Sequence, residues 1–352
     1  MKNKINILLS IILVIAMLSG CAIDKKEGKV DTNKNDKIKI VTTIFPEYDW
    51  VREIVGENIE NVDIKLLMKN GVDLHNYQPN TDDLLAISNA DIFIYVGGHS
   101  DQWVDEALKD PVNKERVVIN LFDVLDGDLK PLIESEGMEH HHHDDEHHDD
   151  DEHHHDDEHH HDDDEHHHDD EQHNENDEHV WLSLQRTMKA IDLISKQLIL
   201  IDNNNSNIYE KNTINYIKEL SDLDQEYRKY IGEGTKDTVV FADRFPFYYM
   251  TEDYGLNYYA AFTGCSAESE ASFETVSFLA KKVDELEIKY LFTIENRTHK
   301  IPETVIESTK SQNLEVLEIN SLQSVTEKDI KEGVTYLSTM KENLDLLKTA
   351  LQ

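Results

Sequence analysis

Basic side chains are scarce in this chain. Its 352 residues carry 34 Lys and Arg against 73 Asp and Glu, a formal net charge of -39. Nucleic-acid binding needs basic surface that displaces counterions from phosphates, so the sequence excludes that class of partner and favours cations as ligands. The scarcity is extreme between Glu139 and Glu178, where 21 acidic residues occur with no Lys or Arg.

The N-terminus lacks an apolar run long enough to cross a membrane. Its run from Ile7 to Leu18 falls short of the roughly 20 residues that a spanning helix needs, so residues 1–20, with their basic start, read as an export signal. Leu18 to Cys21 resembles the lipobox of bacterial lipoproteins, in which the cysteine sulfur takes a diacylglyceryl group. A chance cysteine after an ordinary signal is the alternative. We expect residues 21–36, which are polar and Lys/Asn/Asp-rich, to be a lipid-anchored tether.

Only one other cysteine is present. With Cys21 lipidated, Cys265 has no partner for a disulfide within the mature chain. Two interpretations stay open for Cys265, a buried small hydrophobic residue and a thiol ligand.

Strand and helix patterns alternate along two stretches of the chain. Such alternation predicts parallel sheets covered by helices. The first stretch predicts strands at 37–45, 61–68, 91–97 and 116–121, with helices at 46–56, 81–90, 100–110 and 180–202. The second predicts strands at 237–243, 256–264, 288–295 and 314–320, with helices at 245–255, 272–287, 302–312 and a last helix from a capping box at Thr326 and Asp329 through 351.

A single long helix joins the two series. An apolar stripe at helical spacing predicts it over about residues 207–230. The expected architecture is α/β, with an N-terminal lobe over 37–205, a rigid connecting helix over 206–231 and a C-terminal lobe over 232–352. Open sheets of this kind bind ligands beyond the carboxyl ends of their strands, here a cleft between the lobes.

Histidine is concentrated in one segment. Sixteen of the 20 histidines lie between residues 140 and 173, and the other four are His75, His99, His179 and His299. All four lie in predicted loops or near the ends of strands. Each alone could be a surface or capping residue, but together on one rim of two sheets they favour a folded metal site.

Four stretches of sequence resemble the metal-binding lipoproteins of ABC importers for zinc or manganese, most closely the zinc-binding members. They are "GVDLHNYQPNTDDLLAISNADIFIYVGG", "EHVWLSL" directly after a His-rich loop, "YGLNYYAAF" and "TIENRTHKIPETV", and the resemblance covers essentially residues 37–352. It implies two α/β lobes joined by one long helix, a metal buried between them, and a membrane permease with a cytoplasmic ATPase as partner.

The resemblance carries over three ligand positions. His75 matches the first family histidine, His179 the second, and His299, four residues beyond Glu295, occupies a position that is usually a carboxylate. Imidazole at that position favours Zn²⁺ over Mn²⁺, because nitrogen suits zinc and carboxylate or water suits manganese.

The third ligand position departs from the family. It falls on Arg244, which cannot ligate a metal because it stays protonated. Water or another side chain must then complete the site. Our first choice is His99, followed by the weaker candidates Glu270, Asp243 and Cys265, while Arg244 is expected to form a structural ion pair with Glu268 or Glu270.

The tract within residues 138–178 is expected to be disordered, since it has no apolar residue between His140 and Glu178. Its repeated imidazoles and carboxylates suit weak zinc binding. A purification tag and an inert acidic linker are the alternatives to a metal-collecting loop.

These observations predict a monomeric extracytoplasmic lipoprotein, not an enzyme, that captures Zn²⁺ for an ABC importer. A manganese importer protein, a surface adhesin or metal buffer, and a zinc hydrolase are the rival functions. The hydrolase is disfavoured because no HExxH pair occurs.

Overall fold

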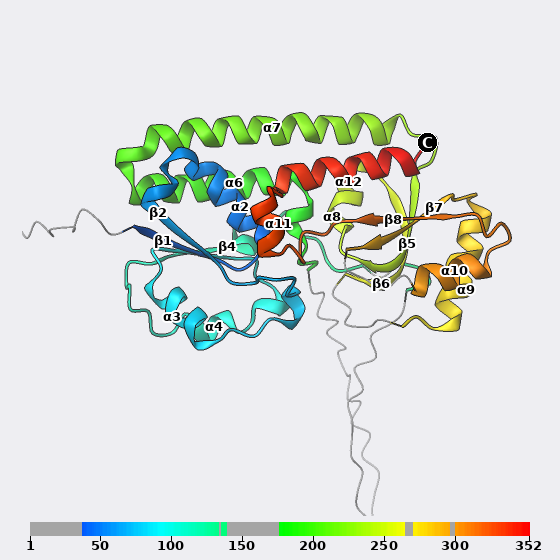
Figure 1. Ribbon diagram of the computed structural model, residues 1–352, viewed down its shortest axis with the longest axis horizontal. Helices are drawn as coiled ribbons and strands as arrows, with labels where there is room; N and C mark the ends of the chain where they lie inside the picture. The colour runs from blue at the N-terminus through cyan, green and yellow to red at the C-terminus, as the bar shows by residue number, and fades with distance from the viewer. Residues whose placement is uncertain (1–36, 134, 139–175, 265–269, 296–299) are drawn as a thin grey trace, which may run out of the picture. The chain divides into compact units, whose positions relative to one another are not determined.

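Two four-stranded sheets, each entirely parallel, organise the chain (Figure 1). The computed structural model describes residues 37–133, 135–138, 176–264, 270–295 and 300–352, and Ile38–Gln352 form one compact unit. The first sheet has the order β2-β1-β3-β4, from β1 (Ile38–Thr42), β2 (Val62–Leu66), β3 (Ile92–Tyr95) and β4 (Val117–Asn120). The second has the order β6-β5-β7-β8, from β5 (Thr238–Phe245), β6 (Asn257–Thr263), β7 (Tyr290–Ile294) and β8 (Glu315–Ile319). The predicted α/β class with two lobes is confirmed.

Helices connect the strands of both sheets. Those of the first series are α2 (Phe45–Val55), α3 (Thr81–Asn89), α4 (Val104–Ala107), α5 (Leu121–Val124) and α6 (Leu184–Ile201), with 3-10 turns η1 (Gly56–Asn61), η2 (Leu74–Asn76), η3 (His99–Asp101), η4 (Val180–Leu182) and η5 (Asn203–Asn205). Those that follow are α7 (Ser206–Gly232), α8 (Tyr248–Tyr254), α9 (Phe273–Glu285), α10 (Lys300–Ser308), α11 (Glu327–Glu332) and α12 (Tyr336–Ala350). Within the described segments, no helix combines the length and apolar character needed to cross a membrane.

The long helix α7 packs against both lobes. It contacts α2 and α6 of the N-terminal lobe and α12 at the end of the C-terminal lobe (Figure 1). Its buried side chains, including Tyr216, Leu220 and Tyr227, recur at helical spacing on one face. A helix with one continuous apolar face can pack against both lobes at once and so fix their positions.

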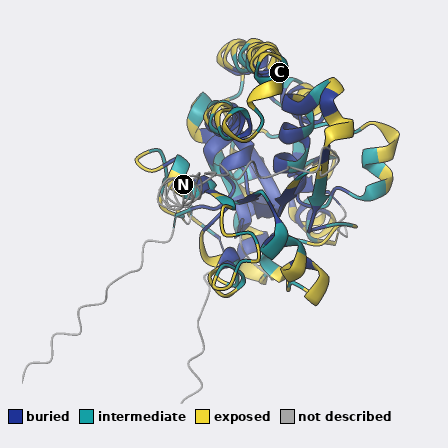
Figure 2. Cartoon of the chain, turned by 90° about the vertical axis from the view of Figure 1, so that its left-hand side faces the viewer, coloured by how far each residue is buried: buried dark blue, intermediate teal, exposed yellow. Residues whose placement is uncertain are grey.

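One hydrophobic cluster extends through both lobes, beside a second cluster around β6 and α9 in the C-terminal lobe. A single cluster of buried side chains contains residues of both sheets, such as Phe93 and Phe292, and Figure 2 shows buried residues gathered in the interior. Buried hydrogen bonds cross between the lobes as well. Trp181 Nε1 donates to the Ser321 carbonyl over 2.9 Å, and the Tyr336 hydroxyl donates to the Trp181 carbonyl over 2.6 Å. The contact between the lobes therefore combines packed apolar side chains with buried hydrogen bonds.

Several predicted helices differ in extent from those of the structure, and two of them differ most. The last one is two helices, because Gly333 adopts a left-handed φ of 94° that ends α11, and Thr335 then caps α12. The helix expected over 100–110 is only the single turn α4. The first residues of the predicted helix form the 3-10 turn η3 instead. There the backbone N–H of Ser100 donates to the Glu178 carboxylate and not to a carbonyl of a helix.

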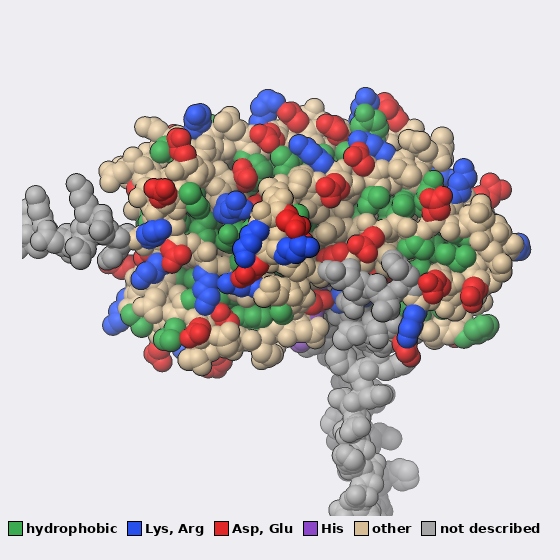
Figure 3. Space-filling model, in the orientation of Figure 1, with side chains coloured by type: hydrophobic (Ala, Val, Ile, Leu, Met, Phe, Trp, Pro, Cys, Tyr) green, Lys and Arg blue, Asp and Glu red, His purple; other side chains and the backbone are tan. Residues whose placement is uncertain are grey.

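Acidic and basic side chains are interspersed over the described part of the face in Figure 3. A surface of this kind differs from the continuous basic patch that nucleic acid requires.

The packing of α7 predicts a large cost for one truncation. Leu220 is fully buried, so Leu220→Ala should lower the free energy of unfolding by roughly 2 to 5 kcal/mol. Ile214, on the same helix but 68% exposed, is the control, and Ile214→Ala should change it by less than about 0.5 kcal/mol. Urea unfolding of the full chain measures both. Equal effects of the two variants on the free energy of unfolding would contradict the burial of Leu220.

The buried carboxyl group of Glu47 predicts a pH dependence of stability. Burial raises its pKa from 4.5 to about 8, although Glu47 Oε2 accepts hydrogen bonds from the backbone of Thr43 and Ile44. The folded state then binds a proton that the unfolded state releases, so this stability is present below pH 4.5 and is lost as the pH rises through about 8. In urea unfolding with a chelator present, Glu47→Gln should flatten the decline between these values. An unchanged decline would show that Glu47 titrates normally.

Candidate metal centre

His75 is held in one tautomer by the end of η3. Ser100 donates its backbone N–H and its hydroxyl to the Glu178 carboxylate, over 2.8 and 2.5 Å. The Ser100 oxygen is thereby left as an acceptor, and His75 Nδ1 lies 2.7 Å from it. The His75 proton is therefore assigned to Nδ1, which leaves a lone pair on Nε2.

His179 is held in the same tautomer by a shorter arrangement. It lies directly before η4 and donates both its backbone N–H and its Nδ1–H to Asp177 Oδ1, over 2.9 and 3.0 Å. A carboxylate only accepts, so the proton is again on Nδ1 and the lone pair on Nε2. Metal-binding histidines typically have such a partner on the nitrogen that does not bind the metal.

The two imidazoles lie next to each other inside the protein. Their ring centroids are 5.5 Å apart, and the His75 and His179 side chains are 10% and 0% exposed. Both Nε2 atoms are buried and have no hydrogen-bond donor among the described residues. Burial is the largest cause and the neighbouring His179 the second that lower the pKa of His75 to about 4, so His75 is neutral at pH 7. Two neighbouring Nε2 atoms that are buried without a protein partner among the described residues are suited to binding a metal cation.

An ion pair across the two lobes borders these histidines. Arg244 Nη2 on β5 donates to Asp73 Oδ2 over 2.7 Å, and Asp73 Oδ1 lies 4.0 Å from His75 Nε2. Burial alone would raise the pKa of Asp73. The positive charge of Arg244, and to a smaller extent His75, outweighs the effect of burial and holds the pKa below its usual value. The structure shows Asp73 as one partner of Arg244. The predicted pairing of Arg244 with Glu268 stays a prediction, since Glu268 lies outside the described residues, and Glu270 is exposed.

Two glycines permit the close approach of these segments. A Cβ on Gly264, after β6, would lie 2.7 Å from His179 Cε1, so a side chain there would collide with the imidazole. Gly98 has a φ of +82°, and a Cβ there would lie 2.6 Å from Glu178 Oε1. The end of the second sheet thus reaches His179 directly, and the loop after β3 reaches the carboxylate that orients His75.

His99 lines the same pocket as His75. The pocket has a volume of about 500 Å³, and its walls also include Ser100, Trp103 and Glu178. His99 itself is exposed, and its Nδ1 lies 3.1 Å from Gln102 Nε2. It would have to turn inward to reach a metal held by His75 and His179.

The structure describes only some of the other predicted site residues. His299, Cys21, Cys265 and Glu268 lie outside the described residues. Glu270 is exposed. Asp243 already accepts hydrogen bonds on both oxygens, from Arg244 N, Thr293 Oγ1 and Ile294 N. Among the described residues, no three potential ligands are grouped closely enough to hold a metal ion.

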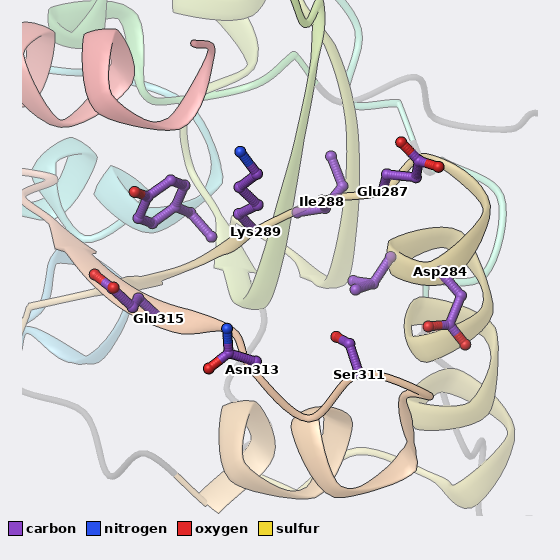
Figure 4. A pocket seen from close by; sticks show the side chains of 9 residues that line it. Asp284, Glu287, Ile288, Lys289, Ser311, Asn313 and Glu315 are labelled. Atoms are coloured by element: carbon purple, nitrogen blue, oxygen red, sulfur yellow. The ribbon is translucent and has the colours of Figure 1, made fainter.

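A second pocket lies at the amino ends of β7 and β8 and has different chemistry (Figure 4). Its volume is about 410 Å³, and none of its lining side chains is a histidine or cysteine. Asp284, which lines it, accepts the backbone N–H of Lys310, and this bond joins the end of α9 to the segment that follows α10. This pocket offers no ligands for a metal that prefers nitrogen.

The sequence reasoning missed the residues that orient the imidazoles. Asp73 and Asp177 each precede a predicted ligand histidine by two positions, and each accepts that histidine's backbone N–H. The Asp-x-His spacing is visible at both positions, but it also recurs within the His-rich tract and so does not single out Asp177. Ser100 and Glu178 carried no comparable signal, because 78 residues separate them in sequence.

Comparison with known proteins places this geometry in a family. Residues 40–350 match the family model described as zinc-uptake complex component A, periplasmic. The zinc-binding protein AdcA of Streptococcus pyogenes is 29% identical over 99% of this chain, which spans only 61% of that relative's length. The high-affinity zinc uptake system protein ZnuA of Bacillus subtilis is 29% identical over 95% of this chain and 94% of its own.

Solved structures agree with this assignment. The Zn(II)-bound ZnuA-like domain of Streptococcus pneumoniae AdcA has a TM-score of 0.66 and 26% identity, covering 90% of this chain and 99% of that domain. The metal-dependent lipoprotein YcdH of Bacillus subtilis has a TM-score of 0.68 and 26% identity, covering 90% and 100%. With its two parallel sheets, its long helix and a family match over most of its length, the chain belongs to the zinc-uptake complex component A family.

Proposed function

We propose that this chain captures Zn²⁺ outside the cytoplasm and delivers it to the permease of an ABC importer. The observation that carries the proposal is the pair of buried imidazoles, His75 and His179, whose Nε2 lone pairs have no donor among the described residues. Membership of a family of solute-binding proteins supports capture and release over catalysis.

The proposed ligand set starts from these two histidines. His299 is the third member, matched by its place in the sequence, and a site rich in imidazole favours zinc over manganese. For the remaining position the sequence offers His99 and then Glu270. Both are exposed, so either would bind only after a side-chain rearrangement.

We further propose that Cys21 carries the lipid anchor, that residues 21–36 tether the two lobes to the membrane, and that the chain acts as a monomer. The lipoprotein name of streptococcal relatives supports the anchor. The division into lobes at 37–205 and 232–352 with a connector at 206–231 belongs to the same proposal. The partner is the permease with its cytoplasmic ATPase.

The His-rich tract is proposed to collect zinc weakly beside the tight site. Its flanks support this arrangement, because they are tied together next to His179. Pro131 pairs with Asn176 in an antiparallel bridge, and Asp177 N donates to the Lys130 carbonyl over 2.9 Å. Metal gathered by the tract would therefore be released close to the cleft.

The proposed function is tested by counting tightly bound zinc. A full-length chain with its 16 tract histidines replaced by serine should keep one tight Zn²⁺ per molecule in chelator competition and lose the weak sites. Within that chain, His75→Ala and His179→Ala should each weaken the tight site by more than roughly 100-fold, the upper end for loss of an orienting partner. Mn²⁺ should compete poorly.

Loss of the tight zinc on replacing the tract would contradict this division of roles. Tight binding that survives both His75→Ala and His179→Ala would contradict the proposed site itself. His99→Ala and His299→Ala complete the series and show which of the two contributes a ligand.

The partner of His179 predicts a graded effect. Asp177→Asn removes the charge that orients the imidazole, so zinc affinity in the tract-replaced chain should fall by about 10- to 100-fold with stoichiometry unchanged. Asp63→Asn, an exposed change on β2, is the matched control and should leave the affinity unaltered. An equal effect of both variants would show that Asp177 has no special role.

A further inference from the structure

The buried positive charge of Arg244 lies beside the candidate metal site, where two imidazoles alone cannot neutralise it. It stands where relatives are expected to have a ligand, it is 4% exposed, and it points across the lobes to Asp73. A buried cation next to a metal site repels a dication unless an anion lies between them. The Asp73 carboxylate lies between, because Oδ2 accepts from Arg244 while Oδ1 is 4.0 Å from His75 Nε2.

The position of Asp73 fits coordination as well as neutralisation. Zinc with tetrahedral ligands at about 2.0 to 2.2 Å places neighbouring ligand atoms about 3.3 Å apart. Asp73 Oδ1 would approach His75 Nε2 by less than about 1 Å to reach that spacing. Oδ1 already accepts the His75 backbone N–H, and a carboxylate oxygen has a second lone pair for a metal.

The neighbouring described carboxylates are committed elsewhere. Asp177 holds the imidazole of His179, and Glu178 accepts from both groups of Ser100. Asp243 accepts on both oxygens at the β5 and β7 pairing. His99 and Glu270 are exposed. Asp73 has an oxygen 4.0 Å from His75 Nε2. It would have to shift toward the histidines to bind a metal with them, because no three potential ligands among the described residues are grouped closely enough as they stand.

We propose that Asp73 is a direct ligand of the captured Zn²⁺ and that Arg244 is its counter-ion. This inference rests on the proposed zinc function and assigns the ligand position that Arg244 leaves unfilled. Without metal, the Arg244 guanidinium neutralises the Asp73 carboxylate. When Zn²⁺ binds, Asp73 Oδ1 coordinates it, and Arg244 keeps its contact with Oδ2 and fixes the direction of the carboxylate.

A double-variant cycle separates ligation from simple neutralisation. Asp73→Asn keeps an oxygen for the His75 N–H but removes the anion, and Arg244→Met removes the cation at similar volume. In the full-length tract-replaced chain, Asp73→Asn should weaken tight Zn²⁺ binding by more than roughly 100-fold, and adding Arg244→Met should not restore it. Recovery of the starting affinity in the double variant would overturn the proposal, because Asp73 would then serve only to neutralise Arg244.

A spectroscopic test avoids reliance on loss of binding. In Asp73→Cys loaded with Co²⁺, a thiolate at the ligand position should add a sulfur-to-cobalt charge-transfer band to the spectrum of the starting chain. Asp63→Cys on exposed β2 is the control and should add none. Asp73→Cys that adds no band would overturn the proposal. Failure of the starting chain to hold one tight Zn²⁺ would instead refute the proposed function.

Discussion

The candidate site depends on two neighbouring imidazoles, those of His75 and His179, whose Nε2 atoms are buried. Each lone pair on His75 and His179 lacks a protein donor among the described residues, which is costly inside a protein unless a cation takes the place of that donor. The surrounding groups maintain this state. Asp177 and the Ser100 and Glu178 pair hold the protons on the opposite nitrogens, and burial keeps His75 neutral at pH 7.

The frame around the histidines links their geometry to the join between the lobes. His179 lies two residues before Trp181, which is fixed to the C-terminal lobe through Ser321 and Tyr336. Gly264 brings the end of β6 to the same imidazole. The hydrophobic cluster that extends through both lobes and the packing of α7 fix the two imidazoles in place. If they bind a metal, such preorganisation lowers the cost of binding.

Much of this architecture was predictable from sequence. Alternation of apolar strands and amphipathic helices depends on local periodicity, so the two α/β series and the long helix could be identified. His75 and His179 stay predicted ligands, and the structure shows that their rings are neighbours. The break at Gly333 was missed because one glycine inside a helical pattern is compatible with either continuation or a cap. The Asp73 and Arg244 pair spans 171 residues and two lobes, and local pattern carries no information on such a contact. His299 and the tract stay predictions, since they lie outside the described residues.

The most direct test of the central claim is anomalous diffraction at the zinc edge from crystals of the zinc-loaded full-length chain. The account predicts one strong peak between the lobes, within about 2.0 to 2.1 Å of Nε2 of both His75 and His179. A strong peak bound elsewhere, with His75 and His179 still bare, would contradict it.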